Sequence, residues 1–177
     1  MDILDIGGES TRPGYTMISD QQEIERVVPI IEEVKAHFDI PISLDTYKSA
    51  VAKAGISAGA DLINDIWGLK YDPQMANVIA SANVPCCLMH NRKEADYKCF
   101  FPELLKDLQE TIDIAKSAGI DPNRIILDPG VGFAKSHENN LESVRRLPEL
   151  ISAFGLPVLL GTSRKRIIGL TLDLPAD

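Results

Sequence analysis

The sequence predicts an α/β fold built on a parallel sheet, of the TIM (β/α)8 barrel type. Short apolar runs rich in β-branched residues alternate with amphipathic helical segments, and this regular alternation is typical of parallel sheets. The runs are apolar at most positions, as expected for strands that are covered on both faces. Each run also ends near polar side chains, which indicates that the strand ends face one shared site.

Six runs are predicted to be strands. In chain order they span Ile3–Ile6, Ile42–Asp45, Leu62–Asp65, Val84–Met89, Ile125–Asp128 and Val158–Gly161. The polar groups near their ends are Asp5, Asp45, Asn64 with Asp65, His90 after Met89, Asp128, and the segment 162–165. An open sheet gathers its site at one switch point, whereas a closed barrel brings every strand end to a single mouth. Contributions from all six strands therefore favour the barrel.

Helix signals lie between these strands. Ser19 and Gln22 have the spacing of a capping box ahead of an apolar stripe. Asp72 followed by Pro73 predicts a second helix start, with the proline at the first helical position. The segment 102–118 predicts a helix that ends at Gly119.

The composition predicts one globular domain over residues 1–177. Of these residues 45% are hydrophobic and 25% are charged, which is enough for one sizeable core. The net charge is −8 and the Lys and Arg residues are scattered, which argues against a nucleic-acid surface. No apolar stretch approaches the length of a membrane span, and the N-terminus lacks the order of a signal peptide. We therefore expect a soluble, cytoplasmic protein.

Cysteine and histidine show no metal-ligand spacing. Cys86 and Cys87 are adjacent in a predicted strand and Cys99 lies in a predicted loop, which favours buried or incidental thiols. His90 follows a strand, where a histidine invites an acid-base or metal hypothesis, but no HxH or HExxH spacing exists. A structural role is the favoured interpretation of His90.

The segment DIGGESTRPG, residues 5–14, carries the strongest functional signal. A carboxylate near the strand end is followed by paired glycines and then by Glu, Ser, Thr and Arg before a stiffening Pro13. A plain glycine turn is the alternative for this segment alone, but polar groups at the other strand ends favour a site. In so acidic a chain an anionic substrate needs local cations, for which Arg12, Lys165 and Arg166 are the candidates.

Taken together, these motifs resemble those of the dihydropteroate synthase family, folate-pathway enzymes with a pterin-binding barrel. The resemblance covers nearly the whole chain. Its motifs are DIGGESTRPG at 5–14, SLDT at 43–46, INDI at 63–66, CLMH at 87–90, LDPGVGFAK at 127–135 and GTSRK at 161–165. ESTRP and SRK in this order are specific, whereas SLDT or INDI alone is not.

The resemblance implies a transferase that condenses 6-hydroxymethyl-7,8-dihydropterin diphosphate with p-aminobenzoate, giving dihydropteroate and pyrophosphate. Such a site must hold a flat polar heterocycle, tolerate a developing cation at the pterin methylene group and neutralise the leaving diphosphate. The resemblance also implies that Mg²⁺ binds together with the substrate diphosphate, with no metal ligand among the residues of this chain.

The resemblance also assigns the pterin slot. Asp128 would accept two parallel hydrogen bonds from the ring, Asn64 would bind another ring edge, and Lys165 would bind the acceptor side. Asp45 would lie near the ring and offset cationic character, so Asp45 and Lys165 are the expected catalytic residues. Met89 would form an apolar wall. Core packing is the alternative for Met89, and helix capping is the alternative for Asp45 and Asp128.

A second set of residues is implied for p-aminobenzoate and the diphosphate. It comprises Thr11, Arg12, Pro13, Phe133 and Arg166. Arg12 would form a fork for phosphate or carboxylate, Phe133 would pack on the aminobenzoate ring, and Arg166 would approach the aminobenzoate carboxylate.

The family has eight strand-helix units, and the chain corresponds to the second through the seventh. We therefore expect the first strand, whose loop carries a magnesium-binding Asn, and the eighth strand, which carries anion-binding Arg and His, to be missing. A catalytically inactive pterin-binding fragment stays open as an alternative. A methyltetrahydrofolate methyltransferase of the same pterin-binding group is a less favoured one, because it needs neither ESTRP nor SRK. A homodimer is a further expectation.

Overall fold

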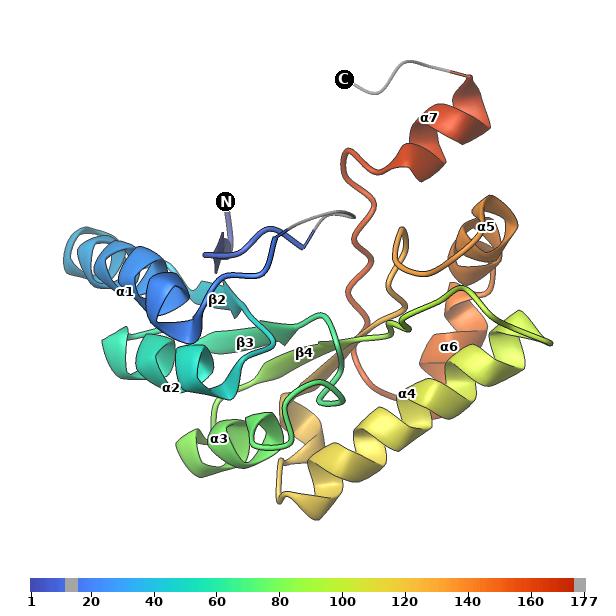
Figure 1. The fold of residues 1–177 in the computed structure, drawn as a ribbon. Helices are drawn as coiled ribbons and strands as arrows, with labels where there is room; N and C mark the ends of the chain where they lie inside the picture. Colours follow the sequence, from blue (N-terminus) through green and yellow to red (C-terminus); the bar gives the residue numbers. More distant parts are fainter. Residues whose placement is uncertain (12–15, 174–177) are drawn as a thin grey trace.

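The computed structural model describes residues 1–11 and 16–173, and its centre is one parallel sheet (Figure 1). The strands are β1 (Leu4–Gly7), β2 (Ile42–Asp45), β3 (Leu62–Asp65), β4 (Cys86–Met89) and β5 (Ile125–Asp128). They lie in the sheet in the order β1-β2-β3-β4-β5, and every pairing is parallel. Sequential order with helical crossovers is the winding of a (β/α) barrel, so the chain forms an arc of such a barrel.

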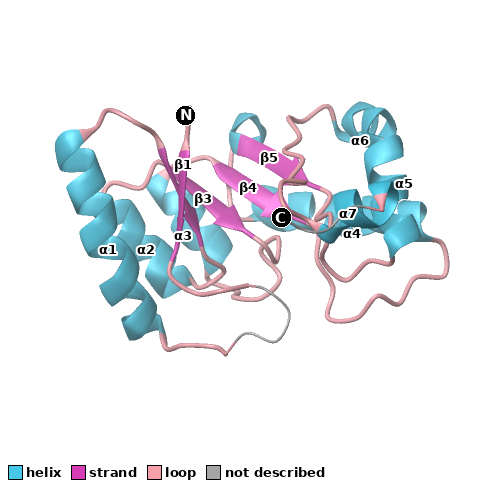
Figure 2. Ribbon diagram, turned by 90° about the horizontal axis from the view of Figure 1, so that it is seen from above, coloured by secondary structure: helices cyan, strands magenta, loops and turns pink. Residues whose placement is uncertain are grey.

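Helices follow each strand. They are α1 (Asp20–His37), α2 (Ser49–Ala58), α3 (Met75–Ala82), α4 (Phe100–Ser117), the 3-10 helix η1 (Pro122–Arg124), α5 (His137–Arg145), α6 (Leu147–Phe154) and α7 (Arg166–Leu172). Figure 2 shows α1, α2 and α3 together on one side of the strands, with α4, α5 and α6 beyond β5. Within the described part of the chain, no helix has the length and apolar character needed to cross a membrane.

The alternation of side chains along the strands gives the sheet two different faces. One face belongs to the main hydrophobic core, which includes Ile6, Leu44, Ile63, Leu88 and Leu127. The residues between them in sequence point the other way, because successive strand side chains alternate. This second face, the inner face, carries most of the polar groups that the sequence analysis selected.

The predicted capping box of α1 is confirmed. The Ser19 hydroxyl accepts a hydrogen bond from the Gln22 amide at 3.2 Å, and the Gln22 side-chain oxygen accepts one from the Ser19 amide at 3.1 Å. The predicted end of α4 is confirmed as well, because Gly119 follows that helix with a φ of +89°.

The predicted helix start at Asp72 and Pro73 is wrong, because α3 begins at Met75. The Asp72 carboxylate instead accepts hydrogen bonds from the Gln74 amide at 2.9 Å and from the Ser49 amide at 2.8 Å. Asp72 therefore holds a turn before α3 and, from a distant part of the sequence, caps the start of α2.

The predicted sixth strand, Val158–Gly161, is also wrong. Val158 forms only an isolated parallel bridge with Leu127, supported by backbone hydrogen bonds from Leu127 to Pro157 and from Leu159 to Leu127, each 2.9 Å long. Leu159 is 45% exposed, so the ladder stops after this one contact. The segment still runs beside β5 and delivers the residues that follow it to the inner face.

The ends of two other strands shift slightly from their predicted positions. β4 begins at Cys86 and not at Val84, since Pro85 has no amide hydrogen to donate to a ladder. β1 covers Leu4–Gly7, one residue later than predicted. Neither shift moves a predicted site residue to the other face of the sheet.

Candidate active site

Strand register brings the predicted pterin residues together on the inner face. Asp45 is the register partner of Asn64, and Met89 is the register partner of Asp128. Cys87 lies between these pairs in the sheet, and the pKa of its thiol is raised by burial and next by the nearby Asp128 carboxylate. Carboxylates from separate strands therefore converge on one volume, as a barrel mouth requires.

Asp128 is buried at the end of β5 and does not cap a helix. Its Oδ1 atom accepts a hydrogen bond from the Gly130 amide at 2.6 Å, whereas the next helix begins only at His137. Burial raises the pKa of Asp128, and the Gly130 amide and Lys165 act in the opposite direction. The helix-capping alternative is thereby excluded for this residue.

Lys165 reaches the same place from the segment after Val158. A Cβ atom at Gly161 would lie 3.6 Å from both the Asp128 Oδ2 atom and the Lys165 Nζ atom, so the two charges flank this glycine. The Lys165 ammonium donates a hydrogen bond to the Val131 carbonyl and lies 4.8 Å from the centroid of the Phe133 ring. Burial lowers its pKa, and Asp128 opposes that shift.

Asp45 is the least satisfied carboxylate of the inner face. Its buried Oδ1 atom has no hydrogen-bond partner among the described residues. The N-cap residue of α2 is Lys48, and the first amide of that helix, at Ser49, donates to Asp72 and not to Asp45. Burial raises the pKa of Asp45 to about 7, and the negative charges of Asp5 and Asp65 add to the effect. An unpartnered buried acceptor of this kind suits a ligand that brings its own donors.

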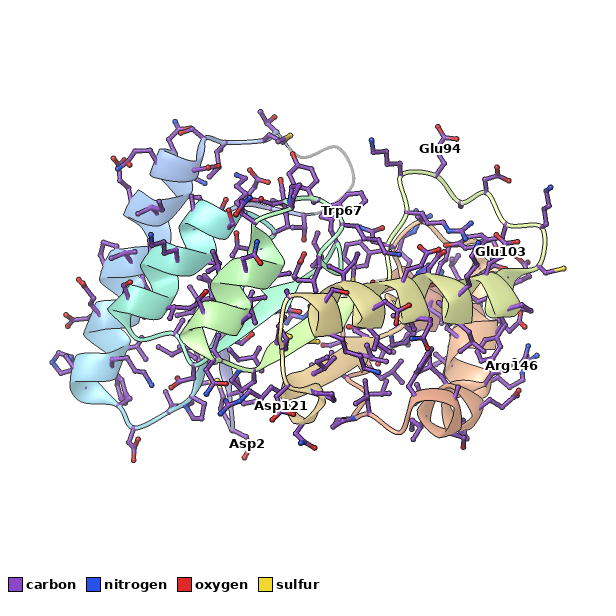
Figure 3. The ribbon with its side chains drawn as sticks, turned by 90° about the horizontal axis from the view of Figure 1, so that it is seen from below. Asp2, Trp67, Glu94, Glu103, Asp121 and Arg146 are labelled. Carbon is purple, nitrogen blue, oxygen red and sulfur yellow. The ribbon has the colours of Figure 1, made fainter. Side chains whose placement is uncertain are left out.

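Met89 and Phe133 belong to a small apolar cluster separate from the main core. The cluster consists of Tyr47, Ile66 and Met89, with Trp67 and Phe133 packed against it. Its members lie at or beyond the carboxyl ends of the strands, and Figure 3 labels Trp67 on the loop after β3. Met89 is therefore packed, as the core alternative held, but in a cluster that borders the polar inner face.

The structure describes only some of the residues predicted for p-aminobenzoate and the diphosphate. Thr11 is partly buried in the loop after β1, and Arg166 is exposed as the first residue of α7. Arg12 and Pro13 lie outside the described residues. Asp5 lies on the inner face, next to its register partner Ser43, and is exposed.

Comparison with known proteins assigns the chain to a family. The family model described as pterin binding enzyme matches residues 1–177. The chain belongs to the pterin-binding enzyme family. Dihydropteroate synthase of Clostridium beijerinckii is 58% identical over 176 residues, which cover 99% of this chain and 65% of that protein.

Solved structures agree with this assignment to the pterin-binding enzymes. A dihydropteroate synthase structure from Clostridium difficile, in the presence of pteroic acid, matches with a TM-score of 0.95 and 44% identity, covering 99% of this chain and 66% of that one. A Xanthomonas albilineans dihydropteroate synthase with 4-aminobenzoic acid matches with a TM-score of 0.92 and 43% identity, covering 97% of this chain and 63% of that one. The chain thus spans about two thirds of the length of these relatives.

In this member of the pterin-binding enzyme family, a buried ion-pair cluster that the sequence analysis missed holds Glu9. Lys48 donates to Glu9 at 2.9 Å, to Glu23 at 2.7 Å and to the Ile18 carbonyl at 2.8 Å. The Tyr47 hydroxyl donates to the other oxygen of Glu9. Glu9 stands inside the ESTRP motif, so its position was a signal, but its partners lie too far away in sequence to be recognised.

A second missed group surrounds His90. The His90 Nε2 atom lies 3.0 Å from Asp107, and the Nδ1 atom lies 2.9 Å from the Lys135 ammonium. Both ring nitrogens of His90 are thus engaged by protein groups. Lys135 closes the LDPGVGFAK motif, which was the available sequence signal.

Among the described residues, 1–11 and 16–173, no group of three or more His, Cys, Asp or Glu is arranged to hold a metal ion.

Proposed function

We propose that this pterin-binding enzyme is a dihydropteroate synthase, which joins 6-hydroxymethyl-7,8-dihydropterin diphosphate to p-aminobenzoate with release of pyrophosphate. The observation that carries the proposal is the convergence of Asp45, Asn64, Asp128 and Lys165 on the inner face. Relatives that are 58% and 54% identical support it, since they carry the name dihydropteroate synthase.

Asp128 would orient the pterin. Its Oδ1 atom is held by the Gly130 amide, while its Oδ2 atom faces the space beside Gly161. A carboxylate accepts parallel hydrogen bonds from adjacent N–H and amino donors, and the pterin ring presents such a pair. Asn64, one strand beyond Asp45, would bind another edge of the same ring.

Asp45 and Lys165 would act on the reacting end of the pterin. As diphosphate leaves, the pterin methylene carbon becomes cationic, and a negative charge at Asp45 stabilises that cation. Lys165 donates to an acceptor of the ring and lies near Phe133, against which the aminobenzoate ring would pack. The amine of p-aminobenzoate would then attack the methylene carbon and lose a proton, and pyrophosphate would be the leaving group.

The diphosphate and the aminobenzoate carboxylate need cations. Arg12, with Thr11 and Pro13 in the same loop, and Arg166 at the start of α7 are the proposed partners. Mg²⁺ would arrive with the diphosphate as part of the substrate. We further propose a cytoplasmic protein that forms homodimers.

The test measures pyrophosphate release by the 177-residue chain with both substrates and Mg²⁺, and pterin binding by calorimetry in the same samples. Aminobenzoate-dependent release that falls at least 100-fold in Asp128→Asn, and not in the exposed control Asp39→Asn, would support the proposal. Pterin binding without release would make the chain a binding fragment. The absence of both pyrophosphate release and pterin binding would contradict the proposal for this chain.

A further inference from the structure

The side chain of Lys135 is partly buried behind the slot and fully used by protein acceptors. Its ammonium lies 2.9 Å from the His90 Nδ1 atom and donates to the Gly130 and Phe133 carbonyls at 3.0 Å each. The His90 carbonyl oxygen is a fourth and more distant acceptor, at 3.4 Å. Two of these acceptors, the Gly130 and Phe133 carbonyls, belong to the loop 129–135, which connects Asp128 to α5. Lys135 therefore stabilises the conformation of its own loop.

His90 continues the chain of contacts away from the slot. Because its Nδ1 atom accepts from Lys135, the proton of a neutral ring sits on Nε2 and is donated to Asp107. Arg92 holds the same Asp107 carboxylate through its Nε atom at 2.6 Å and also reaches Glu103 at 3.0 Å. Glu103 is labelled on α4 in Figure 3. These contacts therefore connect the loop 129–135 to helix α4.

The same loop is pressed against the backbone of His90. The His90 amide donates to the Asp128 carbonyl at 2.8 Å. A Cβ atom at Gly130 would come within 2.0 Å of the His90 carbonyl oxygen, so the loop has no room to shift toward β4. Ala134 adopts a φ of +41°, a strained value for a residue other than glycine, and its carbonyl accepts from Tyr97 at 3.0 Å.

We infer that Lys135 is a positioning residue for the reaction, acting through His90 and the loop 129–135 to hold Asp128 and Phe133 against the slot. This role rests on the proposed function, because Asp128 and Phe133 are assigned to the pterin and the aminobenzoate ring. Lys135 would touch neither ligand. Its amino group holds the loop through these hydrogen bonds. Burial lowers the pKa of Lys135 to about 7; Asp128 and Asp107 oppose that shift, whereas Lys165 and Arg92 add to it.

The experiment replaces Lys135 by methionine, which keeps the length of the side chain and removes its donors. Lys93→Met is the matched control, since Lys93 is exposed in the neighbouring segment before α4. Three quantities are measured by NMR and calorimetry on the 177-residue chain: hydrogen exchange of the Gly130 and Phe133 amides, the pH midpoint at which the His90 ring titrates, and the affinity for pteroic acid.

In Lys135→Met we expect at least tenfold faster exchange at both amides and at least tenfold weaker binding of pteroic acid. The His90 midpoint should rise by about one pH unit, because the ammonium no longer opposes ring protonation while Asp107 still favours it and Arg92 and the Tyr97 ring stay in place. Lys93→Met should change none of the three quantities.

Unchanged amide exchange or an unchanged His90 midpoint in Lys135→Met would overturn the inference. If the parent chain binds no pteroic acid, the proposed function fails for this chain, while exchange and titration still decide the role of Lys135. If Lys135→Met does not fold, Lys135→Gln, which is shorter and uncharged, takes its place. Exchange in Lys135→Gln at the parent rate would overturn the inference equally.

Discussion

Asp45 shows how one residue links the site to stability. Its pKa in the folded protein is about 7, above the ordinary value of 3.8. Between these two pH values the folded state keeps a proton on Asp45 that the unfolded state has released. The contribution of Asp45 to the free energy of unfolding is therefore fully present below about pH 4 and is lost as the pH rises toward 7. The cause is burial beside Asp5 and Asp65, the arrangement that also leaves Asp45 available to a cation.

We accordingly predict that Asp45→Asn raises the free energy of unfolding at pH 8 by on the order of 2 kcal/mol and leaves it nearly unchanged at pH 4. The reason is that the amide carries no charge to be desolvated. Urea unfolding at both pH values measures this, with exposed Asp2→Asn as the control. Equal pH dependence in Asp45→Asn and the parent chain would contradict the prediction.

Two features of its surroundings explain why residue 130 is a glycine. Its φ of +69° is one reason for glycine, and the His90 carbonyl 2.0 Å from a Cβ position is a second. Gly119 has a comparable φ of +89° with nothing within 4 Å of its Cβ position. Comparing Gly130 with Gly119 therefore separates the cost of a positive φ from the cost of a steric contact.

We predict that Gly130→Ala lowers the free energy of unfolding by about 3 kcal/mol or more, because the loop must move off His90. Gly119→Ala should cost only about 1 kcal/mol, the cost of the left-handed conformation. Denaturant unfolding of the two variants gives the comparison. Equal losses would mean that the contact with His90 does not constrain the loop.

At the scale of single elements, α1 has a well-capped N-terminus and a proline in its interior. The capping box at Ser19 satisfies the first turn, whereas Pro29 lies inside the helix and is exposed. A proline there removes one backbone hydrogen bond and crowds the preceding turn. Burial of Val27 and Ile31 against the sheet holds the helix together across this position.

We therefore predict that Pro29→Ala raises the free energy of unfolding by about 2 kcal/mol, less than the full propensity difference because proline also restricts the unfolded chain. Ile30→Ala, at the adjacent 51% exposed position, should stay within about 0.5 kcal/mol of the parent. Thermal and urea unfolding test both. A loss of stability in Pro29→Ala would contradict the prediction.

At the scale of the whole molecule, Lys48 forms ion pairs with segments that lie far apart in sequence. Glu9 from the loop after β1 and Glu23 from α1 meet its ammonium in the interior, where all three side chains are at most 6% exposed. Burial alone would raise the pKa of Glu9, but hydrogen bonds from Tyr47, the Ile18 amide and Lys48 lower it overall. The cluster links the ESTRP loop to α1 and to the start of α2.

We predict that Lys48→Met destabilises the protein by about 3–5 kcal/mol at pH 8, since it leaves buried carboxylates without their cation. The loss should shrink toward pH 5, where protonation of Glu9 relieves the charge. Lys53→Met, at an exposed position of α2, is the control and should stay near the parent. A loss that does not depend on pH would point to packing and not to charge.

The first five strands, the capping box of α1, the end of α4 and the family were all predictable from the amino-acid sequence. These follow from local rules: alternation assigns strand faces, caps and glycines mark helix ends, and motif residues stand at strand ends. The sixth predicted strand failed because Val158–Gly161 reads as an apolar run, whereas a strand needs a continuous hydrogen-bonded neighbour and Val158 has only one bridge.

The partners of the polar groups became known only from the three-dimensional fold. Lys135 with His90, Lys48 with Glu9, and Lys165 beside Asp128 are each separated by more than 30 residues in the chain. Nothing in local propensity or spacing selects such pairs, because long-range contacts depend on how the crossovers set the register of the sheet. Charge and burial then act together at those contacts, and the chemistry of the site depends on both.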